Sequence, residues 1–126
     1  MTILSVEEVL SLHELLIKRY GGSAGLRDRG LLESAVHSVS AAYDDTEVYP
    51  TVEEKAARLA FGLISNHAFV DGNKRIGVMA MLATLELNSI QIVSTSDELT
   101  DLGLGVAAGE LVYEDILAWI KQHLPV

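Results

Sequence analysis

The sequence predicts an all-α fold, in which residues 1–126 form a single-domain bundle of about six helices. Apolar residues recur at the spacing of a helix through most of the chain. Capping sequences mark where several of these stretches begin, and the links between them are short. Hydrophobic residues make up 49% of the 126 residues, which is ample for one core.

Two helices are predicted in the first third of the chain. Ser5–Glu8 reads as a capping box that opens the first helix, and Gly21-Gly22 ends it. His13 falls on the apolar stripe of this helix, so we expect a hydrogen-bonded core histidine there rather than a site residue. A second helix is predicted over Gly30–Ala42, where apolar residues again follow helical spacing.

The polar loop between these helices carries Arg27 and Arg29, which we expect to be solvated or paired with acids. The alternative is that one of them has a role near the phosphate-binding loop. Tyr43–Pro50 is an acidic stretch that we expect to form a loop or a short extended piece. Thr51–Glu54 is a second capping box and opens a third helix. The apolar spacing of that helix extends to His67, which predicts that His67 lies on its buried stripe.

The second half of the chain predicts three more helices. Residues Ile76–Leu87 are apolar almost all round, which is typical of a buried central helix, and Asn88-Ser89 is a plausible stop. Ser96 is the expected cap of a fifth helix that runs to about Ala108. The last helix is predicted over Tyr113–Leu124.

Composition excludes several functional classes. The net charge of -9 argues against a nucleic-acid-binding protein, which would carry a basic footprint. The absence of cysteine excludes disulfide and thiol chemistry. Met1–Leu10 has no basic region, so we expect no signal peptide. No apolar run approaches the roughly 18–20 residues that span a bilayer, so the expectation is a cytoplasmic protein without a membrane partner.

The reactive side chains gather in one stretch, His67–Arg75, which joins the end of the third helix to the start of the central one. The first turn of a helix presents unpaired N–H groups that bind phosphate. Lys74 and Arg75 in that turn oppose the helix dipole, which points to a bound anion. His67 offers a base near neutral pH, and Asp71 offers an oxygen ligand of the kind that magnesium prefers.

This stretch resembles the signature of the Fic/Doc family, His-x-Phe-x-Asp/Glu-Gly-Asn-Gly/Lys-Arg. The matching positions are His67, Phe69, Asp71, Gly72, Asn73 and Arg75. Lys74 stands where Fic proteins usually carry glycine, and Val78 stands where the longer Fic motif has a second arginine. These two departures from the Fic motif resemble the Doc branch, the "death on curing" toxins. The short chain and the segment Arg19–Ser34 are also similar to that branch.

The resemblance implies an enzyme that uses ATP and Mg²⁺, with His67 as general base and Asp71 as magnesium ligand. The nucleotide phosphates would be held by Gly72, Asn73, Lys74 and Arg75. Two alternatives stay open from the residues themselves, because Asp71 could cap the central helix and Asn73 could hold the loop rather than a phosphate. Phe69 is expected to anchor the loop in the core, and Gly77 to be a close-packing site.

Three functions remain open at this stage. The first is a Doc-type toxin that phosphorylates a protein hydroxyl; here the resemblance implies translation elongation factor Tu as target and a Phd-like antitoxin as partner. The second is a Fic-type adenylyltransferase, and the third is a non-enzymatic module whose loop merely holds an anion. Lys74 favours the highly charged γ-phosphate beside His67, and Val78 lacks the charge that would hold the phosphates in the adenylylating direction, so phosphorylation is preferred.

Control of the activity is expected to come from outside the chain. Many Fic proteins are inhibited by their own Ser/Thr-x-x-x-Glu-Gly/Asn sequence, and the nearest approach here is Ser94–Glu98, after which Leu99 breaks the pattern. The expected antitoxin would fold on binding into an apolar groove between helices. The resemblance also implies that Tyr43–Pro50 corresponds to a short flap that aligns the target against the site.

Overall fold

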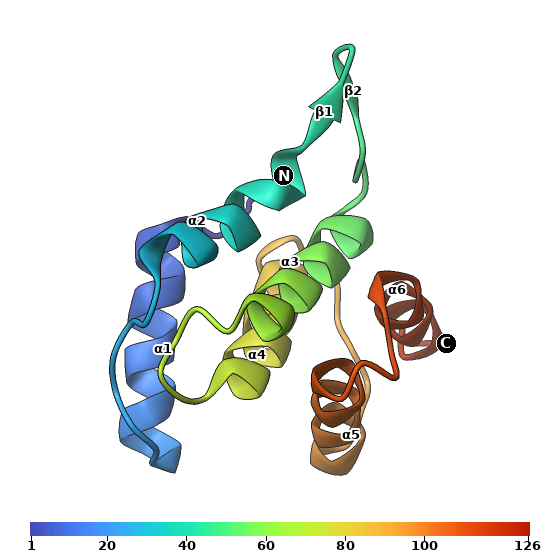
Figure 1. Cartoon of the computed structure of the whole chain (residues 1–126). Helices are drawn as coiled ribbons and strands as arrows, with labels where there is room; N and C mark the ends of the chain where they lie inside the picture. Colours follow the sequence, from blue (N-terminus) through green and yellow to red (C-terminus); the bar gives the residue numbers. More distant parts are fainter.

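Helices make up most of the computed structural model, which describes residues 1–126 (Figure 1). In chain order the elements are α1 (Val6–Tyr20), α2 (Arg29–His37), the 3₁₀ turn η1 (Ser38–Ser40), β1 (Ala42–Tyr43), β2 (Thr46–Glu47), α3 (Val52–Asn66), α4 (Asn73–Leu87), α5 (Ser96–Ala107) and α6 (Tyr113–Gln122). The predicted bundle of six helices is therefore confirmed. None of the six combines the length and the apolar character that crossing a bilayer requires.

Helices α3 and α4 lie along each other at the centre, with α1 and α2 on one side and α5 and α6 on the other (Figure 1). Each central helix contributes to two hydrophobic clusters, one on each side. Gly77 permits their close approach, because a Cβ at this position would overlap the Ile64 side chain and lie 3.2 Å from the carbonyl oxygen of Ala60. The expected close-packing role of Gly77 is confirmed.

Capping boxes open α1, α3 and α5, and two of the three were placed correctly from sequence. Ser5 caps α1 and Thr51 caps α3 as predicted. The cap of α5 is Thr95 rather than Ser96, which is the first residue of the helix. Thr95 is the cap because it and Glu98 bind each other's backbone. The Glu98 carboxylate accepts the N–H of Thr95 at 2.8 Å, and the Thr95 hydroxyl accepts the N–H of Glu98 at 3.1 Å.

Two helices end earlier than predicted. Helix α2 stops at His37, and the Ser38 hydroxyl donates to the carbonyl of Ala35 at 2.7 Å as the chain tightens into η1. The predicted Gly30–Ala42 helix is therefore too long. Helix α6 stops before Leu124, which precedes a proline and so disfavours helical backbone.

The acidic stretch after η1 forms a two-stranded antiparallel hairpin. Its register pairs Ala42 with Glu47 and Tyr43 with Thr46. Asp44 and Asp45 make the turn with φ of 49° and 62°, the left-handed backbone that tight hairpin turns use. The hairpin projects from the N-terminal end of α3 (Figure 1), whereas the motif follows the C-terminal end, about 20 Å further along the helix at 1.5 Å per residue. The role of a flap that aligns the target, which the resemblance implies for this segment, stays a prediction.

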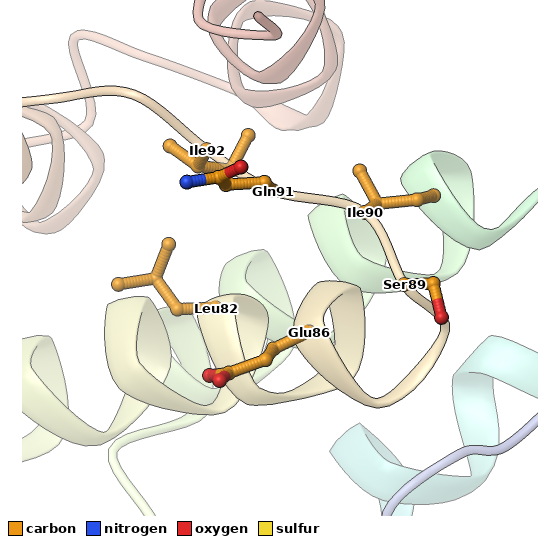
Figure 2. Close-up of a pocket in the computed structure, with 6 residues that line it drawn as sticks. All are labelled: Leu82, Glu86, Ser89, Ile90, Gln91 and Ile92. Carbon is orange, nitrogen blue, oxygen red and sulfur yellow. The ribbon is translucent and has the colours of Figure 1, made fainter.

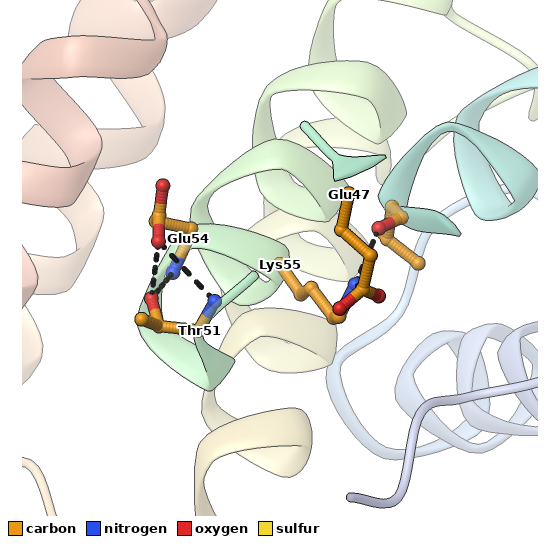
Figure 3. Close-up of polar contacts among 5 residues, drawn as sticks. Glu47, Thr51, Glu54 and Lys55 are labelled. Carbon is orange, nitrogen blue, oxygen red and sulfur yellow. Dashed lines mark hydrogen bonds and ion pairs between the residues drawn. The ribbon is translucent and has the colours of Figure 1, made fainter. Parts of the chain in front are cut away.

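A buried lysine ties this hairpin to the bundle (Figure 3). Lys55 of α3 is 4% exposed, and its ammonium donates to the Glu47 carboxylate at 2.8 Å and to the carbonyl of Val39 at 2.9 Å. A buried ammonium requires such partners because it has lost its water. The hairpin therefore starts from a fixed base at the top of α3.

Candidate active site

The motif forms the loop between α3 and α4. His67 follows the last residue of α3 in left-handed conformation, with φ 50° and ψ 48°, which is uncommon for a residue that carries a Cβ. This backbone turn takes the His67 side chain off the buried stripe and exposes it. The predicted burial of His67 is therefore wrong, because the buried stripe stops where α3 ends, at Asn66.

Asn73 closes the loop from inside. Its side chain is 6% exposed; the amide oxygen accepts the N–H of Phe69 at 3.0 Å, and the amide nitrogen donates to the carbonyl of Phe69 at 3.0 Å. The same nitrogen lies 3.5 Å from Nδ1 of His67, which is the outer limit of a hydrogen bond. This contact orients the ring without fixing which ring nitrogen carries the proton. Of the two roles open from sequence, the structure shows Asn73 holding the loop.

Phe69 and His13 anchor the loop in the core. Phe69 is 2% exposed, and its ring stacks on that of His13 with 3.7 Å between centroids. His13 is 4% exposed, and its Nε2 donates to the carbonyl oxygen of Asp71 at 2.8 Å. Both expectations are confirmed, since Phe69 is a core anchor and His13 is a hydrogen-bonded core histidine. Its partner, however, is the motif itself.

Asp71 presents an ionised carboxylate at the surface of the loop. Hydrogen bonds from the backbone N–H groups of Ser23 (3.0 Å) and Gly72 (2.8 Å) lower the pKa of Asp71. The N-cap of α4 is Gly72, with φ 76° and no side-chain cap, so the interpretation of Asp71 as N-cap is wrong. The two bonds use about half of the lone-pair sites of a carboxylate, which leaves acceptor capacity for a cation.

The predicted site residues all border one pocket of about 550 Å³. Its polar wall consists of His67, Asp71, Gly72, Asn73, Lys74 and Arg75. The facing wall comes from α5 and the second turn of α4, and it includes Val78, Leu99 and Leu104. The pocket can therefore take a molecule that has an anionic end against the N-terminus of α4 and an apolar part beside α5.

Positive charge collects at the polar wall although the chain is acidic. Neither Lys74 nor Arg75 lies within ion-pair distance of a carboxylate, although the charge of Arg75 helps to lower the pKa of Asp71 on the same wall. The Arg75 guanidinium instead lies over the ring of Tyr20, 4.8 Å from its centroid, and Tyr20 also borders the pocket. Two cations at the positive end of a helix, beside a single carboxylate, favour an anion in this pocket.

Comparison with known proteins agrees with this geometry. The profile of the Fic/DOC family matches residues 3–85, which contain the whole motif. The chain belongs to the Fic/DOC family. It is 36% identical over 122 residues to "Protein kinase doc" of Escherichia phage P1, covering 97% of this chain and 95% of that protein. It is 40% identical over 78 residues to "Toxin Doc" of Mycolicibacterium smegmatis, covering 62% of this chain and 60% of that protein.

Arg27 contacts the motif of this Fic/DOC chain, which from sequence is only the less favoured alternative for Arg27 or Arg29. Arg29 pairs with Glu7 and Glu33, as expected of a surface arginine. Arg27 does not pair with an acid, and its guanidinium donates to the backbone carbonyls at the end of α3. Unpaired carbonyls at a helix end signal that donors are required, but the sequence does not tell which distant side chain supplies them.

A second cavity, of about 480 Å³, lies where the link between α4 and α5 crosses α4 (Figure 2). It is bordered by Leu82, Glu86 and residues 89–92. Glu86 is its one ionisable side chain, so this cavity offers no cation for phosphate and no histidine. The chemistry of the Fic/DOC motif is confined to the other pocket.

Proposed function

We propose that this chain is a Doc-type toxin of a toxin–antitoxin system, a protein kinase that transfers the γ-phosphoryl group of ATP to a hydroxyl of a protein target. One observation carries the proposal: His67, the N-terminus of α4 and two cations that form no ion pair border the same pocket. Phosphoryl transfer depends mainly on positioning and charge stabilisation, which this arrangement offers. The printed names of the two relatives, a protein kinase and a toxin, support the same function.

In this proposal His67 takes the proton of the acceptor hydroxyl while the hydroxyl oxygen bonds to the γ-phosphorus. The bond between that phosphorus and the β–γ bridging oxygen breaks, and ADP leaves with the electron pair. Lys74, Arg75 and the first N–H groups of α4 hold the phosphate oxygens, the arginine through its fork and the lysine as a point charge. Asn73 keeps the loop closed and the His67 ring oriented.

Asp71 is the residue that would hold Mg²⁺. Its exposed, ionised carboxylate with free acceptor sites fits a hard cation. No group of three or more acidic or histidine side chains converges in the chain, so further ligands would come from phosphate oxygens and water, as magnesium prefers. When bound, the ion supplies positive charge that offsets the charge of the phosphate oxygens.

Two positions support phosphorylation over AMP transfer. Lys74 borders the pocket where Fic proteins usually carry glycine, and its ammonium favours the most highly charged group of ATP, the terminal phosphate. Val78, one turn further along α4, is apolar and offers no charge to the remaining phosphates. Both features favour a nucleotide whose γ-phosphate faces His67.

For the acceptor we propose elongation factor Tu, and for the inhibitor a Phd-like antitoxin, as the resemblance implies. The structure supports inhibition in trans, because Glu98, the nearest equivalent of an inhibitory glutamate, is engaged elsewhere. Its carboxylate binds the N–H of Thr95 and the ring of His123, and it does not border the pocket. Co-expression of the antitoxin gene is expected to restore growth.

Expression in bacteria tests this function. The wild-type protein is expected to arrest growth, and His67→Ala and Asp71→Ala are expected not to. His37→Ala is the matched control, because His37 is exposed on α2 and does not border the pocket, so this variant should remain toxic. Toxicity of His67→Ala at equal folded abundance would contradict the proposed base.

A further inference from the structure

A single residue outside the motif, Arg27, donates to three consecutive backbone carbonyls around His67. Its Nη2 donates to the carbonyl of Asn66 at 3.2 Å and its Nε to that of His67 at 2.7 Å. Its own backbone N–H donates to the carbonyl of Ala68 at 2.7 Å. Arg27 therefore contacts the backbone on both sides of the residue that carries the base.

Two of these carbonyls, those of Asn66 and of the C-cap His67, need external donors because α3 ends there. The last carbonyls of a helix have no partner within the helix and form the negative end of its dipole. Helix α1 closes with a hydrogen bond from the N–H of Gly21, whereas the C-cap of α3, His67, makes no such bond. A glycine usually takes the left-handed position after a helix. Here His67 takes this left-handed position. The guanidinium of Arg27 donates to the carbonyls of Asn66 and His67 and so stabilises a backbone conformation that is unfavourable for histidine.

The segment around Arg27 runs antiparallel to the motif and keeps the arginine in register with it. The carbonyl of Gly25 accepts the N–H of Val70 at 3.0 Å, and Leu26 forms a β-bridge with Phe69. Arg27 itself does not border the pocket, so it has no direct access to a bound nucleotide. Any effect of Arg27 on the reaction must pass through the backbone of His67.

We propose that Arg27 is a positioning residue: it fixes the left-handed backbone at His67 and thereby the place of the base in the pocket. The inference rests on the proposed kinase function for its rate effect, but its structural part does not. Arg27 is exposed, so truncating it leaves no core cavity. Arg29→Ala is the matched control, because it removes the same charge only two residues further along the chain. The Arg29 side chain forms ion pairs with Glu7 and Glu33 and not with the motif.

Steady-state kinetics of the purified protein is the first measurement. Arg27→Ala is expected to lower kcat about a hundredfold, the cost of a misplaced catalytic group, with little change in KM for ATP. Arg27→Lys reaches one carbonyl instead of two and should fall between Arg27→Ala and wild type. Millimolar guanidinium, far below denaturing concentrations, should restore part of the kcat of Arg27→Ala and none of that of His67→Ala. Arg29→Ala should behave as wild type.

Backbone order parameters of residues 67–69 by NMR provide a readout that does not require activity. They should fall from about 0.85 to below about 0.6 in Arg27→Ala and stay unchanged in Arg29→Ala. An unchanged kcat, a rise in KM alone, or order parameters equal to wild type would each overturn the proposal. If the wild-type protein transfers no phosphoryl group, the proposed function fails and the order parameters still decide on Arg27. If Arg27→Ala does not fold, the same measurements on Arg27→Lys decide.

Discussion

Replacing Asn73 by alanine should destabilise the protein and abolish its activity together. The Asn73 side chain supplies the hydrogen-bond partners of both backbone groups of Phe69, its N–H and its carbonyl. Phe69 is 2% exposed, so water does not reach these groups in place of the lost amide. The alanine variant therefore leaves one buried donor and one buried acceptor without a partner.

The magnitude follows from these two groups. Each buried backbone group left without a partner costs about 1–3 kcal/mol, so the free energy of unfolding should fall by about 2–6 kcal/mol. For a chain of 126 residues this corresponds to a fall in Tm of about 10 °C or more. Activity is lost in addition because the His67 ring loses its contact with Asn73.

Urea denaturation and thermal unfolding measure the effect, with Asn88→Ala as control. Asn88 also makes three hydrogen bonds to the backbone, with the N–H and carbonyl of Thr2 and the carbonyl of Thr84, but it lies near the surface at the other end of α4. Its removal should cost about 1 kcal/mol or less, because water replaces the lost partners. Equal destabilisation of the two variants, or an active Asn73→Ala protein, would refute the reasoning.

Two further predictions concern the bundle. Gly77→Ala should lower the free energy of unfolding in urea by about 1–3 kcal/mol, because the added Cβ overlaps a side chain of α3; an unchanged midpoint would contradict the packing described. The hydrogen bond that the His123 ring donates to the Glu98 carboxylate raises the pKa of His123. This pair therefore stabilises the fold below the unfolded pKa of about 6.5 and stops doing so as pH rises through the folded pKa. His123→Gln should therefore lower Tm more at about pH 5.5 than at about pH 8.5, and a loss of Tm independent of pH would speak against the pair.

Local signals predicted the helices well, because each signal acts over a few residues. Ser5 and Thr51 start helices through contacts three residues away, and these contacts can be read from sequence. The one misplaced cap shows the limit of residue type as a guide. Thr95 and Ser96 are both good caps, and the position of Glu98 decides between them. The reciprocal hydrogen bonds of the capping box between Thr95 and Glu98 select Thr95.

Contacts between distant segments could not be predicted in the same way. The motif identified the pocket residues because the family resemblance assigns a role to each position. It did not show that His67 leaves the buried stripe, which depends on the left-handed end of α3. Nor did it show that Arg27 binds that end, since nothing local distinguishes Arg27 from Arg29. Such pairings arise only when the fold brings the segments together.

Transfer of labelled phosphate to purified elongation factor Tu tests the central claim most directly. The wild-type protein would be incubated with Mg²⁺, the target and ATP labelled at either the α- or the γ-phosphate, and His67→Ala would be treated in parallel. We predict γ-label on a target hydroxyl, no α-label, and no transfer by His67→Ala. Appearance of α-label on the target would contradict the account and assign AMP transfer to the pocket instead.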